Sequence, residues 1–141
     1  KGVTILQDTC PGLVKQIETG ELDSAETRAI LLNALQPMIA KGVDTVVMGC
    51  THYPFIIPLV QQIVGPQVQV IDPAPAVARQ AGRLLESRGL RAVSACETCA
   101  QAAPVRFYTT GNPYHLREML PMLLGETHDV QYVQWESGKL Q

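Results

Sequence analysis

Apolar positions along the chain follow two spacings, and each spacing predicts a different kind of element. Short apolar runs bounded by turn residues predict buried strands, and apolar residues that recur every three or four positions predict amphipathic helices. The strand-like runs cover residues 3–6, 43–48, 68–71, 105–110 and 130–133. The predicted helices cover residues 11–20, 27–41, 54–64, 74–88 and 113–124. Strands that alternate with helices indicate an α/β fold, a parallel sheet with flanking helices on both faces.

The predicted helix over residues 27–41 carries signals at both ends. Asp23 and Glu26 stand three positions apart just before it, a variant of the capping-box spacing. Pro37 is expected to kink or break the helix, because proline removes a backbone hydrogen bond. Gly42 is expected to end it as the left-handed residue beyond the last turn.

Composition limits the classes of protein that this chain can represent. Its 141 residues are the length of one ordinary domain, with 46% hydrophobic and 17% charged residues. The net charge of −2 excludes a strongly basic nucleic-acid-binding surface. No apolar run approaches the roughly 20 residues of a membrane helix, and no signal peptide pattern opens the sequence, so a reducing cytoplasm is the expected location. The chain opens on a strand-like run, which suggests a piece of something longer.

A thiol and an imidazole stand close together directly after the predicted strand over residues 43–48. In open α/β sheets, ligands gather at the carboxyl ends of the strands, where Cys50 would lie. Cys50 also precedes a predicted helix, whose N-terminal partial positive charge favours a thiolate. His52 could hold that thiolate or exchange a proton with it, and Thr51 offers a donor to an anionic ligand. The alternative is that Cys50 is an ordinary packing cysteine.

The remaining cysteines give weaker signals. Cys10 also follows a predicted strand and precedes a proline, but a packing role is expected for it. Cys96 and Cys99 form a single Cys-x-x-Cys within residues 90–104, which lack a clean period and predict a loop with possible helical turns. One such pair without a partner pair predicts neither redox chemistry nor a metal site, so an incidental thiol pair is expected.

No metal site is predicted around Cys50 and His52, because nothing supplies a third and a fourth ligand at convincing spacing. His115 and His128 have no evident partners in the sequence. Both are therefore expected to be surface residues.

The stretch Gly49-Cys50-Thr51-His52-Tyr53-Pro54-Phe55 is more specific than its parts, and it resembles the signature around the second catalytic cysteine of glutamate racemases. Further segments are similar to that family in the same order: residues 8–20, 70–78 and 107–125. Asp8-Thr9 and Gly12 depart from the family wording. The family's first catalytic cysteine, in its amino-terminal half, has no counterpart here. The chain thus resembles the carboxyl-terminal half of a glutamate racemase.

This resemblance implies cofactor-independent racemisation of L- and D-glutamate, with one cysteine removing the α-proton while an opposite cysteine donates another. Cys50 would serve one face of the α-carbon, His52 would assist it, and Thr51 and His52 would bind the substrate. The implied partner is glutamate, with no cofactor, no metal, no nucleic acid and no membrane. A homo-oligomer that supplies D-glutamate for peptidoglycan synthesis in the cytoplasm would follow.

The resemblance also implies a two-lobed, pseudo-symmetric fold. Residues 1–72 would belong to the lobe with the catalytic cysteine, and residues 73–141 would complete the other lobe, whose amino-terminal half is missing. The chain alone is expected to be inactive, to expose apolar surface and to self-associate. Two alternatives remain: a non-catalytic α/β module that binds a ligand or a partner, and a related cysteine-dependent racemase acting on aspartate, hydantoins or a malonate. The complete Gly-Cys-Thr-His-Tyr-Pro string favours glutamate.

Overall fold

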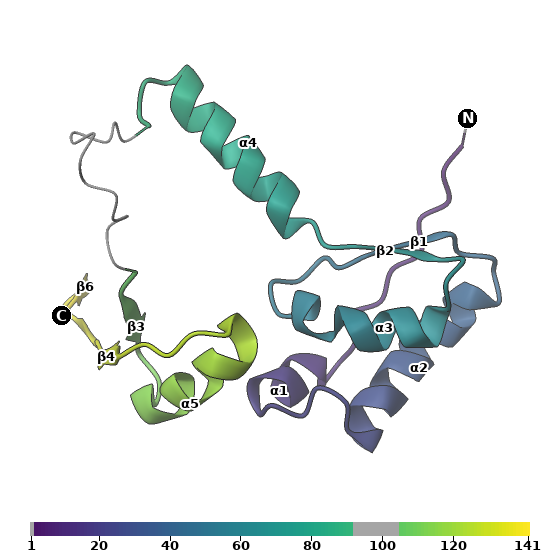
Figure 1. The fold of residues 1–141 in the computed structure, drawn as a ribbon, viewed down its shortest axis with the longest axis horizontal. Coiled ribbons are helices and arrows are strands. Elements are labelled where there is room, and N and C mark those ends of the chain that lie inside the picture. The colour runs from purple at the N-terminus through teal and green to yellow at the C-terminus, as the bar shows by residue number, and fades with distance from the viewer. Residues whose placement is uncertain (1, 92–104) are drawn as a thin grey trace. The chain divides into compact units, whose positions relative to one another are not determined.

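The computed structural model describes residues 2–91 and 105–141, and its contacts divide the chain into two units, Lys1–Arg91 and Ala92–Gln141. The first unit contains α1 (Leu13–Glu18), α2 (Ala25–Ile39), β1 (Thr45–Val47), the 3-10 helix η1 (Tyr53–Ile56), α3 (Ile57–Val64), β2 (Gln69–Ile71) and α4 (Ala74–Ser87) (Figure 1). The second contains β3 (Phe107–Thr109), α5 (Pro113–Leu124), β4 (Val130–Tyr132), β5 (Trp135–Glu136) and β6 (Lys139–Leu140). In the described part of the chain, no helix has the length and apolarity needed to cross a membrane.

Both units contain a pair of parallel strands joined by a helical crossover. β1 and β2 pair with Thr45 opposite Gln69, and η1 and α3 connect them. β3 and β4 pair with Phe107 opposite Val130, and α5 connects them. Parallel strands need such a crossover, because a tight turn can join only antiparallel strands. The predicted α/β fold class is therefore confirmed.

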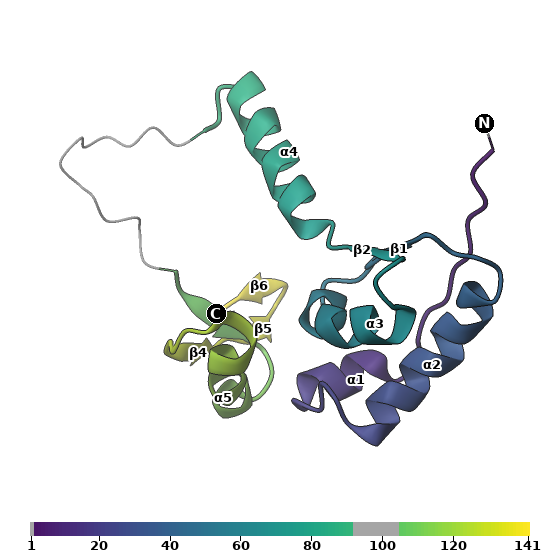
Figure 2. The same ribbon diagram turned by 45° about the vertical axis from the view of Figure 1, so that its right-hand side comes forward.

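The core of the first unit lies between its helices and the β1–β2 pair. Figure 2 shows α1, α2 and α3 gathered on one side of these strands. Val46 and Val70 pack against the core, whereas Val47, the next residue of β1, is 59% exposed. Cover on both faces was predicted, but this outer face of β1 is open. The buried cluster consists of Leu13, Ile17, Leu31, Leu35, Met48, Ile56, Leu59, Val60, Val64 and Val68.

The strand predicted over residues 3–6 does not form. The segment has no regular secondary structure, and Val3 and Ile5 are 86% and 82% exposed. An apolar run becomes a strand only where a neighbouring strand offers hydrogen bonds. Within the described residues, β1 pairs with β2 alone, so this segment has no strand beside it.

α2 begins at Ala25, two residues earlier than predicted, because Ser24 is its N-cap. The Ser24 hydroxyl oxygen accepts a hydrogen bond from the backbone N–H of Thr27 at 3.2 Å. Asp23, the predicted cap, instead accepts a hydrogen bond from the Arg28 guanidinium at 2.8 Å. The predicted Asp23 and Glu26 capping pair is therefore wrong, and the serine hydroxyl satisfies the free N–H group in the first turn.

At the other end of α2, one prediction is wrong and one is confirmed. Pro37 lies inside the helix, which continues to Ile39, so the predicted break does not occur. Gly42 has a φ of 75°, its N–H donates to the Ile39 carbonyl, and the next N–H, from Val43, donates to the Met38 carbonyl. These two bonds form a Schellman motif, which satisfies carbonyl groups that the last helical turn leaves free. The chain then turns directly into β1.

α3, β2, α4, β3, α5 and β4 lie where the sequence predicts them, within a few residues. The loop prediction for residues 92–104, including Cys96 and Cys99, lies outside the described residues. The β5–β6 hairpin was not predicted. Its turn residues Ser137 and Gly138 have φ values of 51° and 78°, which fit the two-residue turn that joins antiparallel strands.

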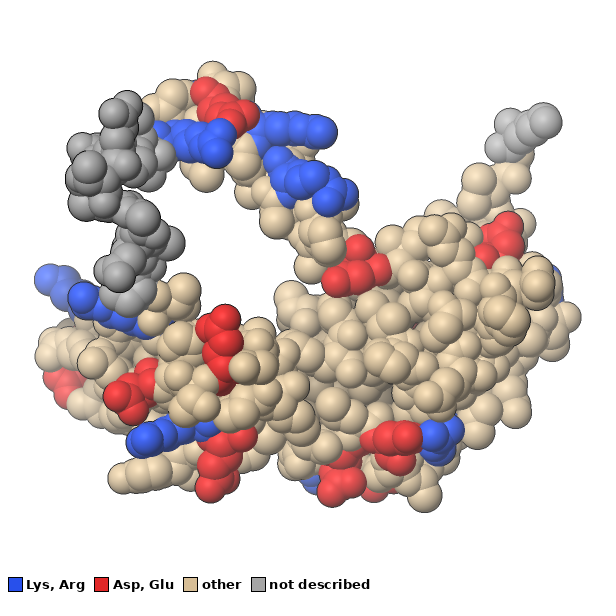
Figure 3. Space-filling view, in the orientation of Figure 1, with Lys and Arg blue, Asp and Glu red and all other residues tan. Residues whose placement is uncertain are grey.

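α4 differs from the other helices of the first unit because it buries none of its side chains. Val77, Leu84 and Leu85 are all exposed on it. Figure 3 shows basic side chains gathered along the same helix. α4 is therefore amphipathic without a packed apolar face in this chain.

Candidate active site

The loop after β1 places Cys50 at the carboxyl end of a parallel strand, as the sequence predicts. Met48, just beyond the last strand residue, is buried in the core and fixes the base of the loop. The backbone N–H of Tyr53 donates to the Cys50 carbonyl at 3.3 Å, which closes the turn that leads into η1. Cys50 itself is half-buried and free, whereas Thr51 is exposed. The thiol is thus held by an ordered turn at the edge where ligands of α/β proteins bind.

Both ring nitrogens of His52 have polar neighbours. His52 Nε2 lies 3.1 Å from Glu18 Oε1, and His52 Nδ1 lies 3.3 Å from Thr51 Oγ1. If Nε2 carries the proton and donates to the carboxylate, Nδ1 accepts from the threonine hydroxyl. A carboxylate in this position fixes the orientation of the ring. The structure therefore brings Thr51, His52 and Glu18 into one hydrogen-bonded row.

Glu18 is a candidate that sequence reasoning missed. It lies at the last residue of α1, and its side chain is 59% exposed, so water screens the attraction between its charge and the imidazole. Glu18 therefore contributes more by orienting the imidazole ring than by the strength of the ion pair. No signal in the sequence selects Glu18, because its contact with His52 joins residues 34 positions apart.

The predicted contact between His52 and the Cys50 thiol is not part of this geometry. Among the described residues, no hydrogen bond joins the imidazole to the thiol, and the ring is directed to Thr51 and Glu18. Assistance of Cys50 by His52 therefore stays a prediction.

Tyr53 links the Cys50 loop to the turn that precedes α1. Its hydroxyl donates to the Thr9 carbonyl at 2.9 Å. In that turn Cys10 has a φ of 45°, and its N–H donates to Asp8 Oδ1 at 2.8 Å. This bond helps to hold Cys10 in a left-handed conformation that residues other than glycine rarely adopt.

Burial raises the pKa of the Cys10 thiol, and the nearby negative charge of Asp8 raises it further. The Tyr53 side chain acts in the opposite direction on the Cys10 pKa, because its hydroxyl favours the thiolate. Burial also raises the pKa of Tyr53, followed by the charges of Cys10 and Cys50. Cys10 is therefore held in its neutral form at neutral pH, consistent with the packing role that the sequence suggests.

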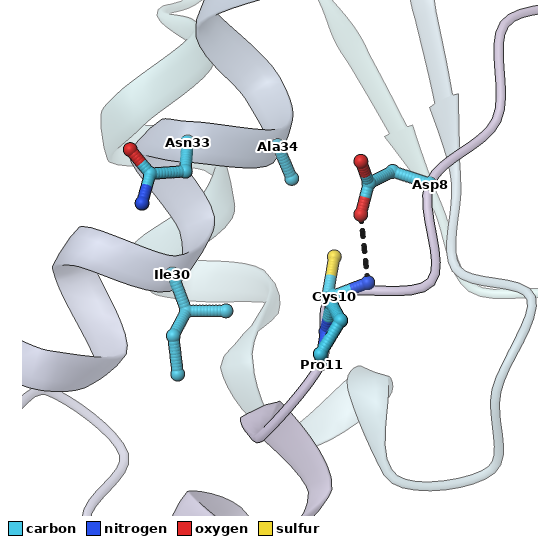
Figure 4. A pocket seen from close by; sticks show the side chains of 6 residues that line it. All are labelled: Asp8, Cys10, Pro11, Ile30, Asn33 and Ala34. Carbon is cyan, nitrogen blue, oxygen red and sulfur yellow. Dashed lines mark hydrogen bonds between the residues drawn. The ribbon is translucent and has the colours of Figure 1, made fainter.

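A shallow cavity of about 180 Å³ lies on the Cys10 side of the first unit. Figure 4 shows Asp8, Cys10 and Pro11 facing three residues of α2 across it, with the Asp8 carboxylate bonded to the Cys10 N–H. The α2 residues are Ile30, Asn33 and Ala34. Cys50 and His52 do not line this cavity, so it is separate from the predicted catalytic thiol.

The remaining histidines lie in the second unit. His115 is exposed on α5, as predicted. His128 was also predicted to be a partnerless surface residue, and this is wrong. It is half-buried, with its Nε2 2.7 Å from Glu126 Oε2 and its ring centroid 4.8 Å from that of Phe107. Within residues 2–91 and 105–141, no three metal-ligating side chains converge.

The fold and this loop define a class: an α/β protein with a free thiol and an imidazole–carboxylate pair at the carboxyl end of a parallel strand. Residues 5–81 match the family described as Asp/Glu/Hydantoin racemase. The match covers more than half of the chain, including the whole of the Cys50 loop. The chain therefore belongs to the Asp/Glu/Hydantoin racemase family.

Relatives within this family carry a more specific name. The chain is 43% identical over 130 residues to a glutamate racemase of Stutzerimonas stutzeri, which covers 92% of this chain and 47% of the relative. It is 41% identical over 128 residues to a glutamate racemase of Pseudomonas aeruginosa, which covers 91% of this chain and 46% of the relative. The chain thus spans about half the length of these relatives.

Solved structures show the same fold. Glutamate racemase from Bacillus anthracis aligns with a TM-score of 0.72 and 28% identity, over 89% of this chain and 45% of that one. Glutamate racemase from Francisella tularensis, solved in complex with D-glutamate, aligns with a TM-score of 0.68 and 25% identity, over 86% and 43%. The resemblance inferred from the sequence motifs is confirmed.

Proposed function

We propose that this chain forms one half of a glutamate racemase, in which Cys50 transfers a proton to or from the α-carbon of glutamate. The observation that carries the proposal is the position of Cys50, at the carboxyl end of β1 and two residues from the His52–Glu18 pair. The family of the chain and the names of its relatives support the same activity. The enzyme is then an isomerase that needs no cofactor.

The proposed chemistry makes specific demands on the site. The α-proton of an amino acid is weakly acidic, so its removal needs a base on one face and fixed dipoles that stabilise the carbanion-like state. Inversion then needs an acid on the opposite face. In the proposed mechanism the Cys50 sulfur accepts or gives one proton, and a second group on the opposite face gives or accepts the other.

The hydrogen-bonded residues Glu18, His52 and Thr51 support the proposed reaction in different ways. Glu18 orients the His52 ring through the Nε2 contact of 3.1 Å. His52 in turn assists the proton transfer at Cys50 once substrate occupies the loop. Thr51, whose hydroxyl lies 3.3 Å from His52 Nδ1, turns that hydroxyl toward a substrate carboxylate when glutamate binds, and His52 binds the substrate beside it.

The partners and the biological setting follow from the same proposal. Residues 1–72 form the lobe with Cys50, and residues 73–141 complete a second lobe together with a further amino-terminal half. The substrate is L- or D-glutamate, the product D-glutamate is used in peptidoglycan synthesis in the cytoplasm, and the enzyme assembles as a homo-oligomer. The relatives' names support these statements only through the activity that they share.

A chimera tests the activity directly. This chain replaces the matching segment of the Stutzerimonas stutzeri glutamate racemase, and exchange of the glutamate α-proton is followed in heavy water. We expect exchange in the chimera and a loss of about 10²–10⁴-fold on Cys50→Ala, the usual loss for a general acid or base. Cys99→Ala, the same substitution at a cysteine with no assigned role, serves as the matched control. A folded chimera without exchange, or equal activity of both variants, would refute the proposal.

A further inference from the structure

Tyr53 carries two connections between segments that are distant in the sequence. Its backbone N–H closes the Cys50 turn, and its hydroxyl donates to the Thr9 carbonyl, 44 positions away. The ring is half-buried and packs against the core of the first unit. The backbone of Tyr53 is bonded to the Cys50 loop and its hydroxyl to the Thr9 turn. This one side chain therefore fixes the distance between the two segments.

The neighbouring residue reaches the opposite end of α1. Thr9 lies shortly before the start of α1 at Leu13, and Glu18, the contact of His52, is the last residue of α1. Two consecutive residues, His52 and Tyr53, therefore fasten both ends of one helix to the Cys50 loop. α1 has six residues and no side chain caps its N-terminus, so it is too short to hold its place by its own backbone bonds.

We propose that Tyr53 is a positioning residue, whose hydroxyl fixes the start of α1 against the Cys50 loop and thereby keeps Glu18 against His52 at the other end. Packing of Leu13 and Ile17 sets which face of α1 is buried. The hydrogen bonds at the two ends add restraints on the axial position and the tilt of α1. The expected effect on catalysis rests on the proposed function. The fastening of α1 by Tyr53 and His52, here called the clamp, does not.

Tyr53→Phe isolates the hydroxyl, because the phenylalanine ring retains the packing. In the chimera we expect kcat to fall about five- to tenfold, the usual effect of one neutral hydrogen bond, with KM changed less than about twofold. In the 141-residue chain we expect amide hydrogen exchange in residues 13–18 to accelerate. Tyr114→Phe, at an exposed tyrosine of α5, is the matched control and should change neither quantity.

The pH profile of thiol labelling gives a readout that a general loss of stability does not imitate. The Tyr53 side chain lowers the pKa of Cys10, so Tyr53→Phe should move the alkylation of Cys10 by iodoacetamide to higher pH. Peptide mass spectrometry separates Cys10 from the other cysteines. An unchanged Cys10 profile together with unchanged exchange in α1 would overturn the clamp. A chimera that is inactive before any substitution would refute the proposed function, and the two measurements on the chain would still decide on Tyr53.

Discussion

His52 Nε2 lies 3.1 Å from Glu18 Oε1, although the two residues are 34 positions apart in the chain. This contact joins the end of α1 to the loop after β1 and turns a histidine in a short motif into part of a carboxylate–imidazole pair. It also gives His52 a partner that the motif alone does not contain. The predictions below test this arrangement and its surroundings.

Removal of the Glu18 charge should impair the proposed reaction. In the chimera, Glu18→Gln keeps the size of the side chain but removes the carboxylate that orients His52. We expect kcat for α-proton exchange to fall about two- to tenfold, the range for one hydrogen bond at a solvent-screened position. Glu26→Gln, at an exposed position in the first turn of α2, is the control and should remain within about twofold of the parent activity. Equal effects of the two substitutions would remove Glu18 from the site.

Cys50 should react with iodoacetamide faster than Cys10 at neutral pH. Burial and Asp8 raise the pKa of Cys10, so little of it is present as the reactive thiolate. Isotope-coded labelling with peptide mass spectrometry measures both rates in one sample. In the chimera, glutamate should slow labelling of Cys50 and leave Cys10 unaffected. Equal rates, insensitive to glutamate, would return Cys50 to the class of packing cysteines.

The 141-residue chain alone should show no measurable exchange of the glutamate α-proton. Inversion needs groups on both faces of the α-carbon, and the proposed function assigns one such group, Cys50, to this chain. Much of the substrate-binding surface should also come from elsewhere, since the chain spans about half of its relatives. Heavy-water exchange followed by NMR measures this. Rates comparable to those of the chimera would mean that the chain is catalytically sufficient.

The free energy of unfolding should fall as the pH rises above 9.0, the ordinary pKa of a cysteine thiol. The folded state holds the Cys10 proton to a higher pH than the unfolded state does, because burial and Asp8 raise the folded pKa. Above 9.0 the unfolded state therefore binds fewer protons, and stability declines with pH until Cys10 ionises in the folded state as well. Urea unfolding between pH 8 and 11 measures the slope. Cys10→Ser should make it shallower, and an identical slope would contradict this account.

A substitution in the core should lower the free energy of unfolding much more than the same substitution on α4. Leu13 of α1 is fully buried in the core, so Leu13→Ala should lower the free energy of unfolding by about 2–5 kcal/mol. Leu85→Ala makes the same chemical change on α4, where the residue is 44% exposed, and should cost less than about 0.5 kcal/mol. Urea unfolding of both variants measures the difference. A large loss with Leu85→Ala would show that α4 packs against the core in solution.

The sequence predicts best those elements whose signals are local. Asn112 accepts hydrogen bonds from two backbone N–H groups at the start of α5, and Pro113 follows it as the first helical residue. Such a cap needs no distant partner, so its position can be read from neighbouring residues. The same holds for Gly42, because its left-handed conformation terminates α2. Element type and most boundaries follow from rules of this kind.

The sequence predicts poorly where a distant residue decides the outcome. The apolar run from Val3 would be a strand if another strand lay beside it, and the pattern does not say whether one does. For the candidate site, the motif identified Cys50, Thr51 and His52 as neighbours in one loop. It gave no means of choosing Glu18 among the acidic residues, because that contact exists only once α1 has packed.

α4 has a thermodynamic consequence of its own. With no buried side chain, its 14 residues gain nothing from the core, and helices of about this length are close to the limit at which an isolated helix holds together in water. α4 should therefore follow a helix–coil equilibrium of its own rather than the cooperative transition of the first unit. In circular dichroism, part of the helical signal should decline gradually with temperature before the main transition, as a sloping baseline. The heat absorbed in that main transition should then correspond to fewer residues than the first unit contains.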